Sequence, residues 1–98
     1  MIVIRNVFSI HPEKMKEAKA AVPQIQAINV RLGMPAGRAL TDLTGPAYTL
    51  VLEMEWPSLA AFEQGLVKVM ADPEWQAAYG RLRPLIASGH REVYSVVA

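Results

Sequence analysis

The sequence contains no cysteine, which excludes disulfide bonds, thiolate catalysis and cysteine-ligated metals. It has no excess of charge of either sign, since ten Lys and Arg residues stand against nine Asp and Glu residues. A nucleic-acid-binding domain normally carries a strong basic excess. No apolar run approaches the roughly 20 residues that a membrane-spanning helix needs, and residues 1–5 lack the basic-then-apolar order of a secretory signal. We therefore expect neither nucleic acid nor a membrane as partner, and a cytoplasmic location.

The motifs of several catalytic classes are also missing. There is no G-x-G-x-x-G phosphate loop and no H-E-x-x-H pattern, and no triad of serine, histidine and acid can be assembled. His11 and His90 are the only histidines, and both are expected in exposed loops. We predict that the protein holds no metal and no cofactor, although His90 would be a general base if the fold carried it into a pocket.

What the sequence does contain is a clear alternation of helical and strand periodicities within one domain, residues 1–98. Pro23 is expected to kink or split the first helix, and Gly89 to end the last one. The order β-α-β-β-α-β predicts a ferredoxin-like α+β fold, with a four-stranded antiparallel sheet and helices on one face. The expected elements are a strand over 1–10, a helix over 12–32, strands over 38–44 and 48–56, a helix in two pieces over 59–69 and 73–88, and a strand over 91–97.

The second face of this sheet is expected to be apolar. Alternation places five valines there: Val3, Val7, Val51, Val93 and Val97. Each buried valine contributes about 1.5 kcal/mol or more, so we predict a homodimer formed by sheet-to-sheet packing. The alternative is an ordinary half-solvated sheet in a monomer.

Three segments of the C-terminal half carry a family resemblance: residues 58–63 (SLAAFE), 71–76 (ADPEWQ) and 89–94 (GHREVY). With the β-α-β-β-α-β order, the chain resembles the dimeric α/β-barrel superfamily, nearest to NIPSNAP-like proteins and more distantly to antibiotic-biosynthesis-type monooxygenases. The resemblance implies a homodimeric α/β barrel and a ligand between the sheet and the helices of each subunit. It does not imply one activity, because the superfamily hosts oxygenases, isomerases, haem-degrading enzymes and proteins of no known activity. The resemblance does not extend to haem binding, because the haem-degrading members need a histidine in the second helical region and residues 58–88 contain none.

Five residues are candidate ligand contacts. Asn6 interrupts the apolar strand face between Ile4 and Phe8, where an amide must find a hydrogen-bond partner. Its position is similar to that of a substrate-facing Asn in the monooxygenase relatives, so it is either a polar anchor in a pocket or a buried amide bonded to the backbone. Trp75 and Tyr79, spaced i, i+4, are either core residues or the wall of a pocket for an aromatic ligand. The remaining two, Tyr48 and Trp56, either border the same cavity or pack against helix ends.

Two functional hypotheses follow. The first is a small protein, of monooxygenase-like or isomerase-like activity if it is an enzyme, that binds or oxidises an apolar or aromatic molecule between sheet and helices without metal or nucleotide. The second is a non-catalytic dimeric module for ligand binding or protein interaction, in which the aromatic residues are all core. A cavity of about 300 Å³ or more that touches Asn6 and Trp75 would favour the first hypothesis.

Overall fold

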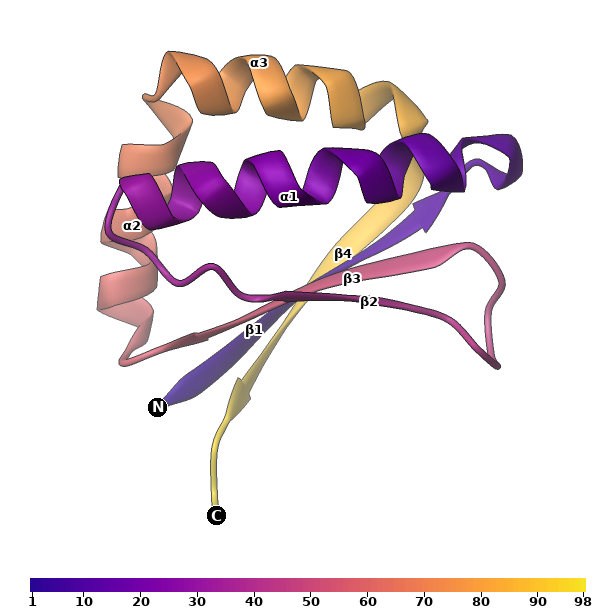
Figure 1. Ribbon diagram of the computed structural model, residues 1–98. Helices are drawn as coiled ribbons and strands as arrows, with labels where there is room; N and C mark the ends of the chain where they lie inside the picture. Colours follow the sequence, from indigo (N-terminus) through magenta and orange to yellow (C-terminus); the bar gives the residue numbers. More distant parts are fainter.

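The computed structural model describes all residues, 1–98, and contains one four-stranded sheet with helices over one of its faces (Figure 1). The strands are β1 (Ile2–Ile10), β2 (Arg38–Thr41), β3 (Thr49–Trp56) and β4 (Ile86–Ser95). The helices are α1 (Met15–Arg31), α2 (Leu59–Met70) and α3 (Pro73–Leu82), with short 3-10 turns η1 (Pro12–Lys14) and η2 (Arg83–Leu85).

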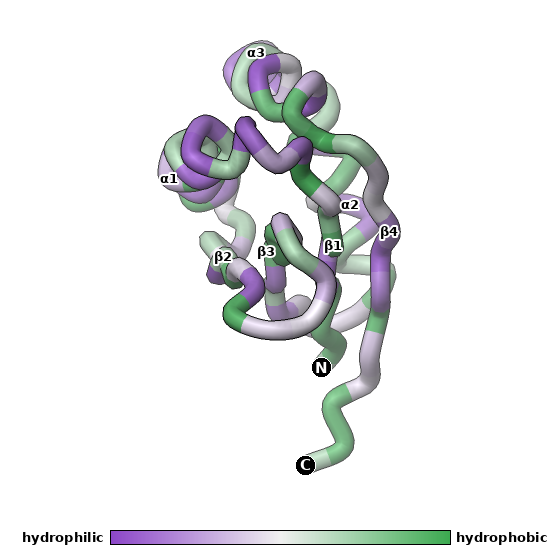
Figure 2. Tube along the Cα trace, turned by 90° about the vertical axis from the view of Figure 1, so that its right-hand side faces the viewer, coloured by the Kyte–Doolittle hydropathy of each residue, from purple (hydrophilic) through white to green (hydrophobic).

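The sheet order is β2-β3-β1-β4, and all neighbouring strands are antiparallel. Helices α1 and α3 lie side by side and run in opposite directions across the sheet, while α2 lies at one end (Figure 1). Viewed from the side, α1 and α3 both lie on the same side of the strands (Figure 2). The predicted α+β ferredoxin-like fold is thereby confirmed. None of the helices combines the length and apolarity of a membrane span.

The core lies between the sheet and the helices and consists of two groups of buried side chains. The larger group joins the ends of β1 and β3 to α1 and α3, and it contains Ile10, Ala18, Val22, Ile25, Ile28, Leu50, Ala78, Leu82 and Leu85. The smaller group packs the opposite end of the sheet against α2 and contains Ile4, Trp56 and Phe62. Side chains on the helix-facing side of the sheet between these two groups are only partly buried, which matters for the site described below.

The register of β4 corrects the predicted composition of the open sheet face. Val93 pairs with Ile4, which is buried under the helices, so Val93 faces the helices as well. Val97 lies beyond the end of β4. Val3, Val7 and Val51 share the open face as predicted.

The predicted interruption of the first helix at Pro23 is not found, because α1 runs unbroken from Met15 to Arg31. A proline in a helix removes the hydrogen bond to the carbonyl four residues earlier, here that of Lys19. Both Pro23 and Lys19 are exposed, so water can satisfy the freed carbonyl. The helix therefore tolerates this proline.

The last strand begins five residues earlier than predicted, and Gly89 lies inside it instead of ending a helix. Pro84 has no N–H to continue the α3 hydrogen bonds, so α3 stops at Leu82. Gly89 is needed because the ring of Phe8, directly opposite on β1, lies close to its backbone. A Cβ at position 89 would lie 2.8 Å from Cδ1 of Phe8. Gly89 therefore lets the Phe8 ring lie against β4.

Candidate functional site

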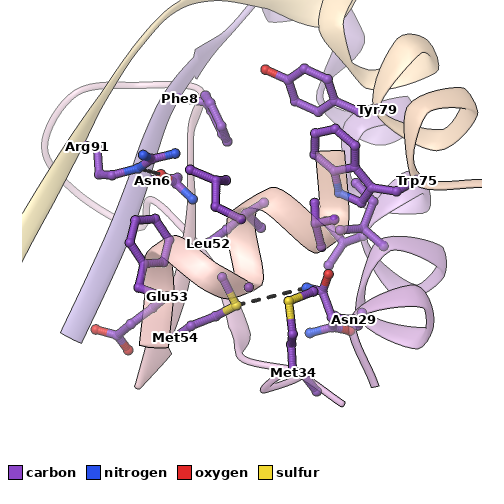
Figure 3. Close-up of a pocket in the computed structure, with 18 of the residues that line it drawn as sticks. Asn6, Phe8, Asn29, Met34, Leu52, Glu53, Met54, Trp75, Tyr79 and Arg91 are labelled. Carbon is purple, nitrogen blue, oxygen red and sulfur yellow. Dashed lines mark hydrogen bonds between the residues drawn. The ribbon is translucent and has the colours of Figure 1, made fainter. Parts of the chain in front are cut away.

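A cavity of about 730 Å³ lies between the sheet and the helices, and most of the residues around it are apolar. Its size falls within the roughly 300–1,000 Å³ typical of small-molecule sites. Figure 3 shows it bounded by β1, β3 and β4 on one side and by the helices on the other.

The sheet side of the cavity follows from strand alternation. Asn6 pairs with Leu52 on β3 and with Arg91 on β4, and all three side chains face the helices. Asn6 is half-buried, and its Oδ1 accepts a hydrogen bond of 2.8 Å from Nε of Arg91. The partner of this amide is therefore a side chain of the cavity wall and not the backbone.

The helix side presents an aromatic pair from α3. The rings of Trp75 and Tyr79 are stacked, with centroids 4.9 Å apart and planes 5° from parallel. Their i, i+4 spacing places them on one side of the helix. Asp72 caps the start of the helix, and its carboxylate accepts a hydrogen bond of 2.9 Å from the backbone N–H of Trp75. Both rings are half-buried and line the cavity.

Trp56 lies where the cavity meets α2. It is 7% exposed, packs edge-to-face on Phe62 at 5.8 Å, and also lines the cavity. Its Nε1 is buried and has no hydrogen-bond partner. Trp56 thus both packs against a helix and borders the cavity, while its indole nitrogen is covered by protein atoms.

Tyr48, the fifth predicted contact, does not line the cavity. It precedes β3 instead of belonging to it, and its φ of 61° marks the left-handed conformation of a turn. The side chain is 44% exposed, while the backbone carbonyl accepts a hydrogen bond of 2.8 Å from the N–H of Ile10. The predicted strand over 48–56 does not include Tyr48, because the turn before it extends to residue 48.

The sequence reasoning missed Asn29, a buried amide of the cavity wall on α1. Its Nδ2 lies 3.9 Å from Sδ of Met54, a weak acceptor, and its Oδ1 has no partner in the protein (Figure 3). Asn29 follows Val22 and Ile25 on the buried side of the helix. A polar residue on an apolar stripe is the same signal that identified Asn6, and it was available in the sequence.

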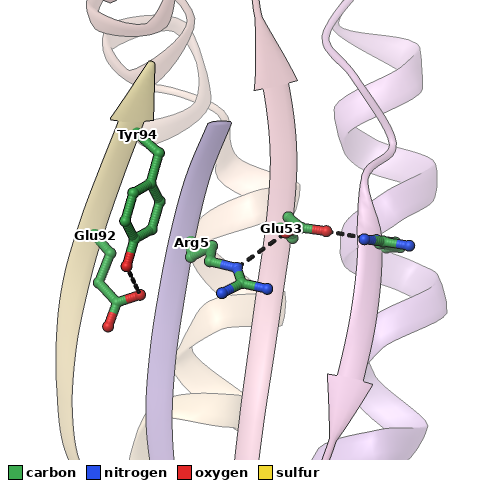
Figure 4. Close-up of polar contacts among 5 residues, drawn as sticks. Arg5, Glu53, Glu92 and Tyr94 are labelled. Carbon is green, nitrogen blue, oxygen red and sulfur yellow. Dashed lines mark hydrogen bonds and ion pairs between the residues drawn. The ribbon is translucent and has the colours of Figure 1, made fainter. Parts of the chain in front are cut away.

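Several charges on the opposite, open face of the sheet are paired with one another. Glu53 binds Arg5 at 2.9 Å and also binds Arg38, and the hydrogen bond from Arg38 is the main cause that lowers the pKa of Glu53 (Figure 4). Glu92 contacts Nε2 of His90 and the hydroxyl of Tyr94, each at 2.8 Å. These two bonds lower the pKa of Glu92, and its carboxylate raises the pKa of Tyr94.

Of the two histidines, only His11 lies where the sequence predicted it. His11 is exposed between β1 and η1, as expected, whereas His90 is exposed on β4 instead of in a loop. His90 lies at the cavity edge but is bonded to Glu92 on the open face. No three His, Asp or Glu side chains come together in an arrangement that could hold a metal ion.

The fold and the cavity together define a class: a ferredoxin-like α+β domain with a ligand-sized space between sheet and helices. The NIPSNAP family model matches residues 4–98, so the chain belongs to the NIPSNAP family. This confirms the family resemblance seen in the sequence.

Solved structures agree with the family assignment. The chain is similar to a NIPSNAP family protein from Agrobacterium tumefaciens strain C58, with 26% identity and a TM-score of 0.81 over 95% of this chain and 82% of that one. It is similar to an uncharacterized NIPSNAP domain protein from Burkholderia xenovorans, with 19% identity and a TM-score of 0.87 over 100% and 96%. It shares its fold with an antibiotic biosynthesis monooxygenase, with 16% identity and a TM-score of 0.76 over 100% of both chains. No curated protein matches the sequence.

Proposed function

We propose that this protein binds a small, mainly aromatic molecule in the cavity between the sheet and the helices. The observation that carries the proposal is a cavity of about 730 Å³ that touches both Asn6 and Trp75. A filled core would have favoured a purely structural role for the aromatic residues, but this volume is in the range of small-molecule sites.

The chemistry of the walls indicates what such a molecule would look like. The stacked Trp75–Tyr79 pair offers a flat apolar surface, which suits a planar ring system. Polar side chains are the minority of the wall, and among them Oδ1 of the buried Asn29 has no hydrogen-bond partner in the protein. A ring system with one or two polar substituents matches this set.

The test uses the neutral probe 2-naphthamide and isothermal titration calorimetry. The two tryptophans of the chain both line the cavity, so their fluorescence gives an independent reading of its occupancy. We expect binding accompanied by a change in tryptophan emission. The variant Leu52→Trp, which adds bulk at the half-buried sheet side of the cavity, should abolish binding while the protein stays folded. Absence of binding by the parent protein, or unchanged binding by Leu52→Trp, would contradict the proposal.

Asn6 is proposed as a polar anchor within this cavity. Replacing it with Ala removes one hydrogen-bonding group, which contributes about 0.5–1.5 kcal/mol net. The affinity for 2-naphthamide should therefore fall about threefold to tenfold. Equal affinities of Asn6→Ala and the parent would show that Asn6 is not an anchor.

A second candidate is oxidation of the bound molecule by O₂. The similarity of the whole fold to an antibiotic biosynthesis monooxygenase favours it. Native mass spectrometry of gently purified protein would identify a retained molecule, and that molecule would then be supplied in air while O₂ consumption is followed. No O₂ consumption above that of the Leu52→Trp variant would leave binding as the function.

We also propose that a second copy of the chain covers the open sheet face. Val3, Val7 and Val51 are half-exposed there, and Arg5 and Glu53, which lie between them, are already paired within the subunit. Glu55, opposite Val3, is the one unpaired carboxylate on this face, and it is exposed. Sedimentation should give twice the 10.8 kDa chain mass. Val51→Lys should give single chains, whereas the control Val67→Lys, on the exposed side of α2, should not. A parent protein that sediments as a single chain would refute this proposal.

A further inference from the structure

Arg91 is a cation on the cavity wall that has no carboxylate partner. Arg5, Arg31 and Arg38 all form ion pairs, but Arg91 forms none. It is nevertheless held in place: Nε donates to Oδ1 of Asn6, and the guanidinium carbon lies 5.0 Å from the centre of the Phe62 ring. An arginine fixed on an apolar wall without a counter-ion has binding capacity that the protein itself does not use.

The hydrogen bond between Arg91 and Asn6 determines which of their donor groups remain free to bind a ligand. Because Nε of Arg91 is occupied by Asn6, the two Nη groups remain as free donors. Because Asn6 turns its oxygen towards Arg91, its Nδ2 has no acceptor in the protein. Figure 3 shows Asn6 and Arg91 on one side of the cavity and the Trp75–Tyr79 pair on the other, with Leu52 between them. Free donors therefore gather at one side of the cavity, and aromatic surface lies at the other.

We infer that Arg91 and Asn6 bind the carboxylate of an aryl carboxylate whose ring system occupies the cavity against Trp75 and Tyr79. The inference deepens the proposed function and rests on it. The two Nη groups of a guanidinium match a planar carboxylate in a bidentate contact. Arg91 is exposed, so the carboxylate remains partly hydrated at the rim and its desolvation cost is small. A carboxamide of the same shape would turn an N–H towards these donors and bind less well.

The other charged residues of the cavity wall are accounted for. Glu53 is the single acidic residue that borders the cavity, but its carboxylate lies on the open face of the sheet, where Arg5 and Arg38 neutralise it, so it does not repel an anion strongly. Arg83 also lines the cavity without an ion pair, but no hydrogen bond orients it. Arg83 is therefore the rival anchor that the experiment must separate from Arg91.

The experiment compares 2-naphthoate with 2-naphthamide by calorimetry at pH 7.5. The parent protein should bind the carboxylate about tenfold more tightly, as expected for a charge-assisted contact in a partly exposed site. Arg91→Gln should remove this preference by weakening 2-naphthoate about tenfold while 2-naphthamide changes less than twofold. Arg91→Lys, which keeps the charge but loses the fork, should lie between the two. The control is Arg81→Gln, which removes the same charge from the outer side of α3, where Arg81 bonds Gln24, and should match the parent.

The outcomes distinguish this inference from the proposal beneath it. If 2-naphthamide binds but the parent shows no preference for 2-naphthoate, the carboxylate inference is refuted and the ligand site stands. The inference is also refuted if Arg91→Gln keeps the preference for 2-naphthoate. It is refuted as well if Arg83→Gln loses more of this preference than Arg91→Gln does, because Arg83 would then be the anchor. If neither probe binds, the ligand site itself is refuted and the inference falls with it. Circular dichroism spectra of all variants should match the parent.

Discussion

Gly65 on α2 offers a sharp test of how closely the helix packs on the cavity wall. A Cβ at this position would overlap Cη2 of the Trp56 indole and lie 3.0 Å from Sδ of Met34. Trp56 is buried between β3 and α2, so its ring cannot move away from α2 except into the cavity. We therefore expect Gly65→Ala to destabilise the protein, although alanine is the better helix former.

Two opposing magnitudes decide the size of the effect. Forcing a methyl group into a filled site costs about 1–3 kcal/mol. Replacing glycine by alanine inside a helix contributes about 1 kcal/mol in the other direction. The free energy of unfolding should therefore fall by about 1 kcal/mol, which lowers the Tm of a domain of this size by about 4–8 °C.

Gly80 on α3 is the matched control, because a Cβ there would meet no atom within 4 Å. Gly80→Ala has the helix-propensity gain without the clash, so its free energy of unfolding should rise by about 0.5–1 kcal/mol. Urea unfolding of the two variants and the parent measures both values. Tryptophan emission should shift in Gly65→Ala alone, since Trp56 moves towards the cavity. If Gly65→Ala proved as stabilising as Gly80→Ala, the close packing of Trp56 on α2 would be wrong.

Three further predictions concern other parts of the molecule. Because Arg38 and Arg5 lower the pKa of Glu53 below its ordinary 4.5, this carboxylate stabilises the fold above that pH and loses its contribution as the pH falls below it. Urea unfolding between pH 6 and pH 3 should thus show a steeper loss of stability in the parent than in Glu53→Gln, and parallel profiles would contradict the argument. Ser58→Ala removes the hydroxyl that caps α2, so the free energy of unfolding should fall by about 1 kcal/mol. Thermal unfolding measures this loss, and an unchanged Tm would show that the cap does not stabilise the helix. Tyr48→Gly should leave 2-naphthamide affinity unchanged, since Tyr48 lies outside the cavity, and a weakened affinity in calorimetry would place it at the site after all.

The fold was predictable because its strongest signals are local. Alternation within β1 and β3 and the helical stripe of α1 follow directly from which residues are apolar. The Asp72–Pro73 start of α3 was likewise visible, since the Asp72 carboxylate caps the helix and Pro73 needs no N–H in its first turn. These features depend on neighbours within a few residues of each other in the sequence.

The predictions that failed depend on residues far apart in the sequence. Gly89 was interpreted as a helix stop because its tight approach to Phe8, across β1, cannot be seen locally. The facing of Val93 was wrong for the same reason, since the face of each β4 residue is set by its register against β1. The same error hid Arg91, whose partner Asn6 lies 85 residues away.

The register of β4 thus decides the chemistry of both faces of the sheet. β4 is an edge strand that pairs only with β1, and a slip of one residue would exchange its two sets of side chains. Arg91 would then leave the cavity, while His90 and Glu92 would enter it. The bond between Arg91 and Asn6 forms only in the observed register, so it opposes such a slip as well as orienting the guanidinium. A weakened anchor in Asn6→Ala should therefore appear both as lost ligand affinity and as faster amide hydrogen exchange along β4.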